Sequence, residues 1–170
     1  METERCIYAR KSVRKYSGRR LGREAVEQLL LAGLQAPSGK NGQPWRFLVV
    51  QEDRELLSRL SALTVYEPFV RTADALVAVI LDKTRSYHYV KDCQAIGACI
   101  ENMLLLAADR GIGACWIGEI LNRETAVREL LGLSKSLDLM AVLALGAPGE
   151  EPDTVRMNKR SLSDCLLGWY

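Results

Sequence analysis

The chain has 170 residues, a mass of 19.0 kDa and a formal net charge of +2, with 48% hydrophobic and 26% charged residues. A chain of this size buries roughly 70% of its unfolded surface, so we expect a single domain over residues 1–170. The small net charge gives no reason to expect a nucleic-acid partner. No apolar run is long enough to span a membrane, and the charged N-terminus does not resemble a signal peptide.

Cysteine and histidine usage argues against a metal centre. The chain has five cysteines without a CxxC pair, and His88 is its only histidine. A structural zinc site usually needs four Cys or His ligands at short spacing, so we expect no metal site. Free thiols are typical of reducing compartments, which favours a cytoplasmic protein.

Hydrophobic spacing and chain breakers predict helices that alternate with strands. In chain order, we expect a helix over 24–36, a strand over 46–51, a helix over 53–62, a strand over 75–81, a long central helix from about 92 to 110, an apolar strand-like run over 114–120, a helix over 123–132, a strand over 139–146 and a short helix over 161–167. Asp53 is expected to cap the second helix, and Gly111 to end the central one. The alternation alone favours a parallel sheet, although no strand leads into the glycine fingerprint of a dinucleotide-binding fold.

The first candidate binding segment is ARKSVRKYS, residues 9–17. It places Arg10, Lys11, Arg14 and a further lysine around the hydroxyl of Ser12. Such a set suits a phosphate dianion, because each charge-assisted hydrogen bond contributes about 1.5–3 kcal/mol. A solvated basic arm without a ligand is the alternative that composition alone favours. The segment RMNKRS, residues 156–161, is also basic and contains Lys159 and Arg160.

The second candidate segment leads from the first predicted helix into the first strand. Its side chains Ser38, Asn41 and Gln43, together with backbone exposed by two glycines, could bind a flat heterocycle with donor and acceptor edges. Pro37 and a second proline would stiffen this loop. The alternative is a plain turn into a strand, with Trp45 as a core residue.

The third candidate segment is GIGACWIGEI, residues 111–120. Small residues surround Ile117 and Gly118, so the backbone could approach a planar ligand closely. The alternative is a helix end followed by a core strand. The sequence contains no nucleophile elbow, P-loop or zinc-protease motif, and His88 is expected to be a surface or core residue rather than a general base. If the protein is an enzyme, a bound cofactor is expected to carry the chemistry.

Together these segments resemble the nitroreductase family of FMN-dependent oxidoreductases over nearly the whole chain. The similarity consists of an RxSxR motif followed by Tyr16, the loop APSxxNxQPWxF at 36–47, and a glycine-led run ending in CWIG at 118. The resemblance implies an α+β fold with a mainly antiparallel sheet of four to five strands, flanked by helices around a long central helix. It also implies a homodimer with FMN at the subunit interface, and the apolar C-terminal LLGWY favours dimerisation independently.

The resemblance also implies a set of cofactor-binding residues: Arg10, Lys11, Ser12, Arg14, Pro37, Ser38, Asn41, Gln43, Ile117, Gly118, Lys159 and Arg160. The first three would hold the FMN phosphate together with Lys159 or Arg160. Arg14 would lie near the N1 and O2 edge of the ring, and the backbone of 117–118 near its reactive N5. The loop 37–43 would reach the ring and the ribityl chain from the partner subunit.

The implied activity is transfer of a hydride from NAD(P)H through flavin N5 to a small oxidised acceptor, such as a nitroaromatic or a quinone, in a ping-pong reaction. The chain is short for the family and lacks the Asn and Lys that longer members carry around 66–71, so the acceptor and the choice between NADH and NADPH stay open. Two alternatives are a flavin-binding protein without turnover, serving storage or regulation, and an anion-binding interaction module.

Overall fold

The computed structural model describes residues 2–150 and 159–169. Its centre is an antiparallel sheet in the order β1-β2-β4-β3. The strands are β1 (Trp45–Val50), β2 (Ala75–Asp82), β3 (Gly113–Ile117) and β4 (Leu137–Gly146). All three strand pairs are antiparallel, so the α+β expectation is confirmed and the parallel sheet suggested by the alternation of elements is wrong.

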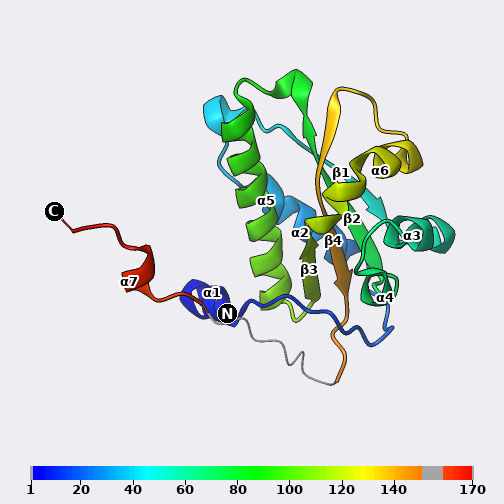
Figure 1. Cartoon of the computed structure of the whole chain (residues 1–170). Coiled ribbons are helices and arrows are strands. Elements are labelled where there is room, and N and C mark those ends of the chain that lie inside the picture. Colours follow the sequence, from blue (N-terminus) through cyan, green and yellow to red (C-terminus); the bar gives the residue numbers. More distant parts are fainter. Residues whose placement is uncertain (1, 151–158, 170) are drawn as a thin grey trace.

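Helices cover both faces of the sheet (Figure 1). The helices of the described residues are α1 (Thr3–Ala9), α2 (Arg23–Leu34), α3 (Arg54–Ser61), α4 (Glu67–Val70), α5 (Tyr89–Asp109), α6 (Glu124–Leu131) and α7 (Leu162–Cys165), with short 3-10 turns η1 (Gly39–Asn41), η2 (Lys83–Arg85) and η3 (Glu119–Arg123). None of the helices described is long and apolar enough to cross a membrane.

The central strand β2 explains why both faces need cover. All eight of its residues are buried, and their side chains alternate between two cores. Val77 and Val79 face the core that α2 and α5 cover, whereas Leu76 and Ile80 face the core on the side of α3 and α6. The sheet therefore buries apolar residues on both sides, and the strand reads as a continuous hydrophobic run.

The helix α5 is the long central helix that the sequence predicts. Its buried stripe includes Ile96, Ile100 and Met103, at helical spacing. Gly111 follows its end with a φ of 66°, the left-handed conformation expected of it. Where Gly33 of α2 packs against α5, an added Cβ would lie 2.9 Å from Cys99 Sγ, so only glycine fits without a shift.

Two helices were not expected from the sequence. The helix α1 lies in a charged stretch and buries only Cys6, whose thiol donates a hydrogen bond to the carbonyl of Leu105 at 3.0 Å. The helix α4 has four residues and buries only Val70. Neither has the repeated apolar stripe on which helix prediction depends.

Candidate functional site

The basic segment 9–17 lies along the lower end of the sheet in Figure 1 and is held there by its backbone. The Val13 N–H donates to the carbonyl of Ala114 at 2.9 Å, and the Ser17 N–H to that of Ala147 at 2.9 Å. The Tyr16 hydroxyl donates to the carbonyl of Ala144 at 3.0 Å. These contacts fix the segment against the ends of β3 and β4.

A cradle of about 180 Å³ opens between this segment and the end of α5. Its lining combines Arg10 and Lys11 with Leu104 and the glycine-bearing stretch 111–114. Arg10 Nε lies 3.3 Å from Glu101 Oε1, which holds the guanidinium over the outer surface of α5. Among the described residues, the side chains of Lys11 and Ser12 have no hydrogen-bond or ion-pair partner.

The loop 37–43 is built from backbone conformations that side chains rarely adopt. Lys40, Asn41 and Gln43 have φ values of 54°, 53° and 47°, and they are the non-glycine residues of the described chain with positive φ. Such strain persists where surrounding contacts determine the backbone, and it is frequent at binding sites. Here Ser38 Oγ accepts from the Gln43 N–H at 3.0 Å and closes the loop. Arg85 Nε donates to the carbonyl of Gly42 at 3.1 Å and holds it from outside.

The exposed groups of this loop are polar. The Gln43 side chain is already used, since its Nε2 donates to the carbonyl of Asn41 at 3.3 Å. The Asn41 side chain is exposed and has no partner in the part of the chain that the structure describes. The Lys40 ammonium lies 4.9 Å from the centroid of the Tyr87 ring, a cation–π distance. Trp45, just beyond the loop, is a core residue.

Segment 9–17, which lines the cradle, and the loop 37–43 lie near opposite ends of α5 in one chain (Figure 1). Gly39 packs against Tyr87, just before α5 begins, whereas Lys11 and Val13 line the cradle with Leu104 and Ala108. A helix of 21 residues is about 30 Å long. One chain therefore does not bring these two predicted groups of residues together.

The remaining predicted residues are only partly placed. Ile117 is buried at the end of β3, and Gly118 after it is exposed. Lys159 and Arg160 are exposed, and Arg160 donates to the carbonyl of Asp164 at 2.7 Å. Within the described residues, no hydrogen bond or ion pair joins them to segment 9–17. Residues 156–158 of the second basic segment lie outside the described residues.

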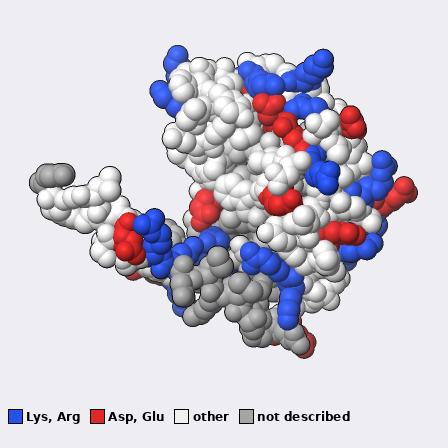
Figure 2. All heavy atoms as spheres, in the orientation of Figure 1, with Lys and Arg blue, Asp and Glu red and all other residues white. Residues whose placement is uncertain are grey.

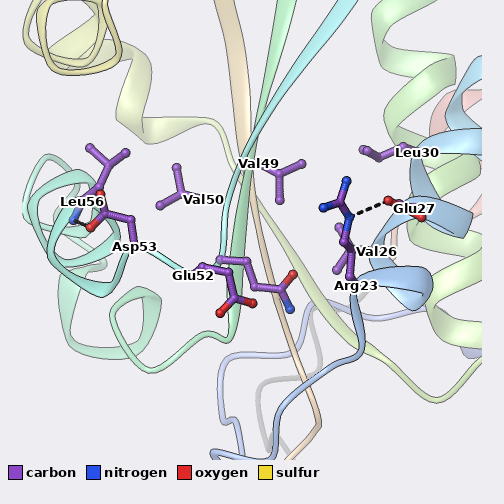
Figure 3. A pocket seen from close by; sticks show the side chains of 10 residues that line it. Arg23, Val26, Glu27, Leu30, Val49, Val50, Glu52, Asp53 and Leu56 are labelled. Atoms are coloured by element: carbon purple, nitrogen blue, oxygen red, sulfur yellow. Dashed lines mark hydrogen bonds and ion pairs between the residues drawn. The ribbon is translucent and has the colours of Figure 1, made fainter.

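A groove of about 470 Å³ lies elsewhere, along the outer end of the edge strand β1. Figure 3 shows Val50 on the side of Leu56 of α3, and Val49 on the side of Leu30 of α2. None of the predicted cofactor residues lines it. The groove is larger than the cradle, but its apolar floor offers no arrangement of cations for a phosphate.

Glu119, which directly follows Gly118, is a residue that the sequence analysis missed. Its Oε2 accepts hydrogen bonds from the Thr64 hydroxyl at 2.6 Å and the Val65 N–H at 3.1 Å. These two donors, the hydroxyl first, hold the pKa of Glu119 below its ordinary value. Nothing in the sequence links positions 64 and 119, although an acidic residue directly after the CWIG run was a visible signal.

The described residues contain no cluster of three metal-ligating side chains, and all five cysteines are free thiols. His88 is exposed at the start of α5. Burial raises the pKa of Cys99 to about 12, so this thiol stays neutral. The described side chains therefore offer polar and cationic groups for binding rather than a nucleophile with a general base.

Known proteins resemble this chain over most of its length. The Nitroreductase family model matches residues 7–65 and 58–147. A protein of Archaeoglobus fulgidus, provisionally named NADH dehydrogenase/NAD(P)H nitroreductase, is 38% identical over 162 residues, which cover 94% of this chain and 92% of that protein.

Solved structures agree with the sequence matches. The crystal structure of a provisionally named nitroreductase from Desulfovibrio desulfuricans, in complex with FMN, has a TM-score of 0.93 at 37% identity, covering 100% of this chain and 98% of that one. A provisionally named NADH oxidase from Clostridium acetobutylicum has a TM-score of 0.86 at 30% identity, covering 97% and 99%. With a family model matched over most of its residues and such relatives aligned along nearly their whole lengths, the chain belongs to the nitroreductase family.

Proposed function

We propose that this protein is an FMN-dependent oxidoreductase that takes a hydride from NAD(P)H and passes it to a small oxidised acceptor, such as a nitroaromatic or a quinone, in a ping-pong reaction. The observation that carries the proposal is the cradle, which combines cations with closely approaching glycine backbone. The FMN complex of the similar Desulfovibrio protein and the nicotinamide-dependent activities in the names of the relatives support it. We also propose that residues 1–170 act as one domain.

The cradle fits the phosphate end of FMN. Arg10 is oriented by Glu101, while Lys11 and Ser12 keep their donors unused among the described residues. Lys159 or Arg160 would complete the set, since both are exposed. Gly111 and Gly113 in the lining carry no side chain, which leaves room for a phosphate or ribityl group.

At the ring end, Arg14 would place its charge near N1 and O2, and the exposed backbone at Gly118 would lie near N5, with Ile117 fixed in the core behind it. Bound FMN would supply the hydride chemistry, accepting two electrons from NAD(P)H and donating them to the acceptor. The Arg14 guanidinium would stabilise negative charge that develops at N1, which favours two-electron reduction.

A second copy of the chain would complete the site. The cradle is smaller than the roughly 300–1,000 Å³ of pockets that enclose drug-sized ligands. The loop with Pro37, Ser38, Asn41 and Gln43 lies near the other end of α5, so it would contact FMN bound in the partner's cradle. We therefore propose a homodimer with FMN at the interface.

Two partly apolar surfaces support the homodimer. The outer face of α5 presents Val90, Gly97, Leu105 and Ala108, none of them fully buried, around Gln94 and Glu101, and a Cβ on Gly97 would meet open space. Figure 2 shows a broad uncharged area over this side of the molecule. The segment that follows α7 extends away from the sheet and the helices that cover it (Figure 1), and Trp169 in this segment is 88% exposed. Monomers rarely leave such apolar surface uncovered.

The test is spectroscopic. Purified protein mixed with FMN should bind it and show a flavin spectrum, which should bleach on anaerobic mixing with NADPH or NADH. A bound flavin that does not bleach would favour storage or regulation. Protein that binds no FMN would contradict the proposal and favour the anion-binding module. The five free cysteines make a reducing cytoplasm the proposed location.

A further inference from the structure

One carboxylate ties together two turns that are far apart in the sequence. Glu119 directly follows Gly118, and its Oε2 accepts from the Thr64 hydroxyl at 2.6 Å and the Val65 N–H at 3.1 Å. Its Oε1 accepts from Asn122 Nδ2 at 3.3 Å, within the same turn as Glu119. Hydrogen bonds to an ionised carboxylate are about twice as strong as neutral ones. The turn at 64–66 is therefore held beside the turn at 118–122.

The two tied turns carry exposed apolar side chains. Val65 is 73% exposed and Tyr66 45%, and both follow Thr64 directly. Leu121, on the other turn, is 40% exposed. The Tyr66 ring is steadied by Phe69, with ring centroids 5.8 Å apart. None of these three side chains belongs to the buried core, and the hydrogen bonds of Glu119 hold the turn that carries Val65 and Tyr66 close to the turn that begins at the exposed Gly118.

We propose that Glu119 is a positioning residue that holds Val65 and Tyr66 beside Gly118, where they form an apolar wall of the acceptor-binding space. The inference rests on the proposed function, in which Gly118 borders the flavin ring. The wall selects planar, uncharged acceptors such as quinones over hydrophilic anions, because apolar contact favours the former only. A quinone would gain a hydride whose electrons come from NAD(P)H and a proton from solvent, and would leave as the hydroquinone.

The test compares two acceptors in the FMN-loaded enzyme: 2-methyl-1,4-naphthoquinone, which is planar and apolar, and ferricyanide, which is a hydrophilic anion. Val65→Ser and Glu119→Ala should each raise KM for the quinone about threefold to tenfold, with kcat changed less than about twofold. KM for ferricyanide and the rate of flavin reduction by NADPH should stay within about twofold of the wild type. Glu119→Gln should be intermediate, because its amide oxygen can still accept from Thr64 and Val65 but carries no negative charge.

Asp53→Asn is the control, since the Asp53 carboxylate also accepts a backbone hydrogen bond, from the Leu56 N–H at 2.8 Å at the start of α3, and lies on neither tied turn. It should leave both KM values unchanged. Val65 is so exposed that its replacement cannot unfold the core, which keeps the test decisive if Glu119→Ala is unstable. If Val65→Ser leaves the KM for the quinone unchanged, and NADPH still bleaches the bound flavin, the inference is overturned but the proposed function stands. A wild type that does not bleach would instead defeat the proposed function.

Discussion

Arg14 is the residue whose charge is expected to set the redox properties of the site. Arg14→Gln removes a cation beside the proposed N1 position, so the reduced flavin loses stabilisation and its midpoint potential should fall. A loss of about 1.4 kcal/mol corresponds to about 30 mV for a two-electron couple. Spectroelectrochemical titration of the FMN-loaded variant measures the shift. Arg19→Gln, an exposed arginine outside the proposed site, is the control, and an equal shift in both variants would remove Arg14 from this role.

At the same scale, the sequence identifies which residues are chemically suited to the site better than it identifies their geometry. The residue types of Ser38 and Asn41 point to polar recognition, but the left-handed backbone at Asn41 is set by outside contacts such as that from Arg85. The link from Glu119 to Thr64 is likewise invisible, because it depends on how β3 and α4 meet in space.

At the scale of the elements, every strand and most helices can be predicted from the spacing of hydrophobic residues and the positions of chain-breaking residues. The predicted strand 75–81 is β2 within one residue, and Asp53 caps α3 as expected, accepting from the Leu56 N–H. Strand direction does not follow, since the alternation of elements suggests a parallel sheet where the pairs are antiparallel. Only the family resemblance indicated the correct arrangement, because pairing depends on tertiary packing that a local pattern does not encode.

The contact between α2 and α5 depends on Gly33. Gly33→Ala places a methyl 2.9 Å from Cys99 Sγ and 3.1 Å from Met103, and overpacking a core costs about 1–3 kcal/mol. The better helix propensity of alanine returns up to about 1 kcal/mol. Urea unfolding should therefore show a net loss of about 1 kcal/mol. Gly97→Ala inside α5, whose added methyl meets nothing within 4 Å, should instead stabilise by up to about 1 kcal/mol, and a similar effect in both variants would argue against tight packing at Gly33.

The turn after β2 should make stability depend on pH. The hydroxyl of Thr84 donates to Asp82 Oδ1 at 2.6 Å and is the main cause that lowers the pKa of this buried carboxyl, with Arg46 assisting at 2.9 Å. Because its pKa is lower in the folded chain, the ionised Asp82 carboxylate stabilises the fold at pH values above the ordinary carboxyl pKa. This stabilisation is lost as the pH falls through the lowered pKa. Asp82→Asn should cost about 1–2 kcal/mol near neutral pH and less near pH 3. Urea unfolding at both pH values measures the difference in unfolding free energy between the wild type and Asp82→Asn. A difference that does not change with pH would contradict a stabilising role of the ionised carboxylate.

At the scale of the whole molecule, the outer face of α5 and the C-terminal tail predict association. The full chain should sediment as a dimer at micromolar concentration, and deletion of residues 162–170 should weaken dimerisation at least about tenfold, since it removes four large exposed apolar side chains. Trp169→Ser in the full chain should act in the same direction. A wild type that sediments as a monomer would rule out the shared site.

The 30 Å reach of α5 has a genetic consequence. If each FMN is bound by the cradle of one subunit and the loop of its partner, a chain with a disabling substitution at Arg10 and a chain with one at Asn41 should together restore FMN binding. Their hybrid would contain one pocket with both lesions and one with neither. Co-expression of the two alleles should therefore restore about half of the flavin per hybrid, whereas either allele alone restores none.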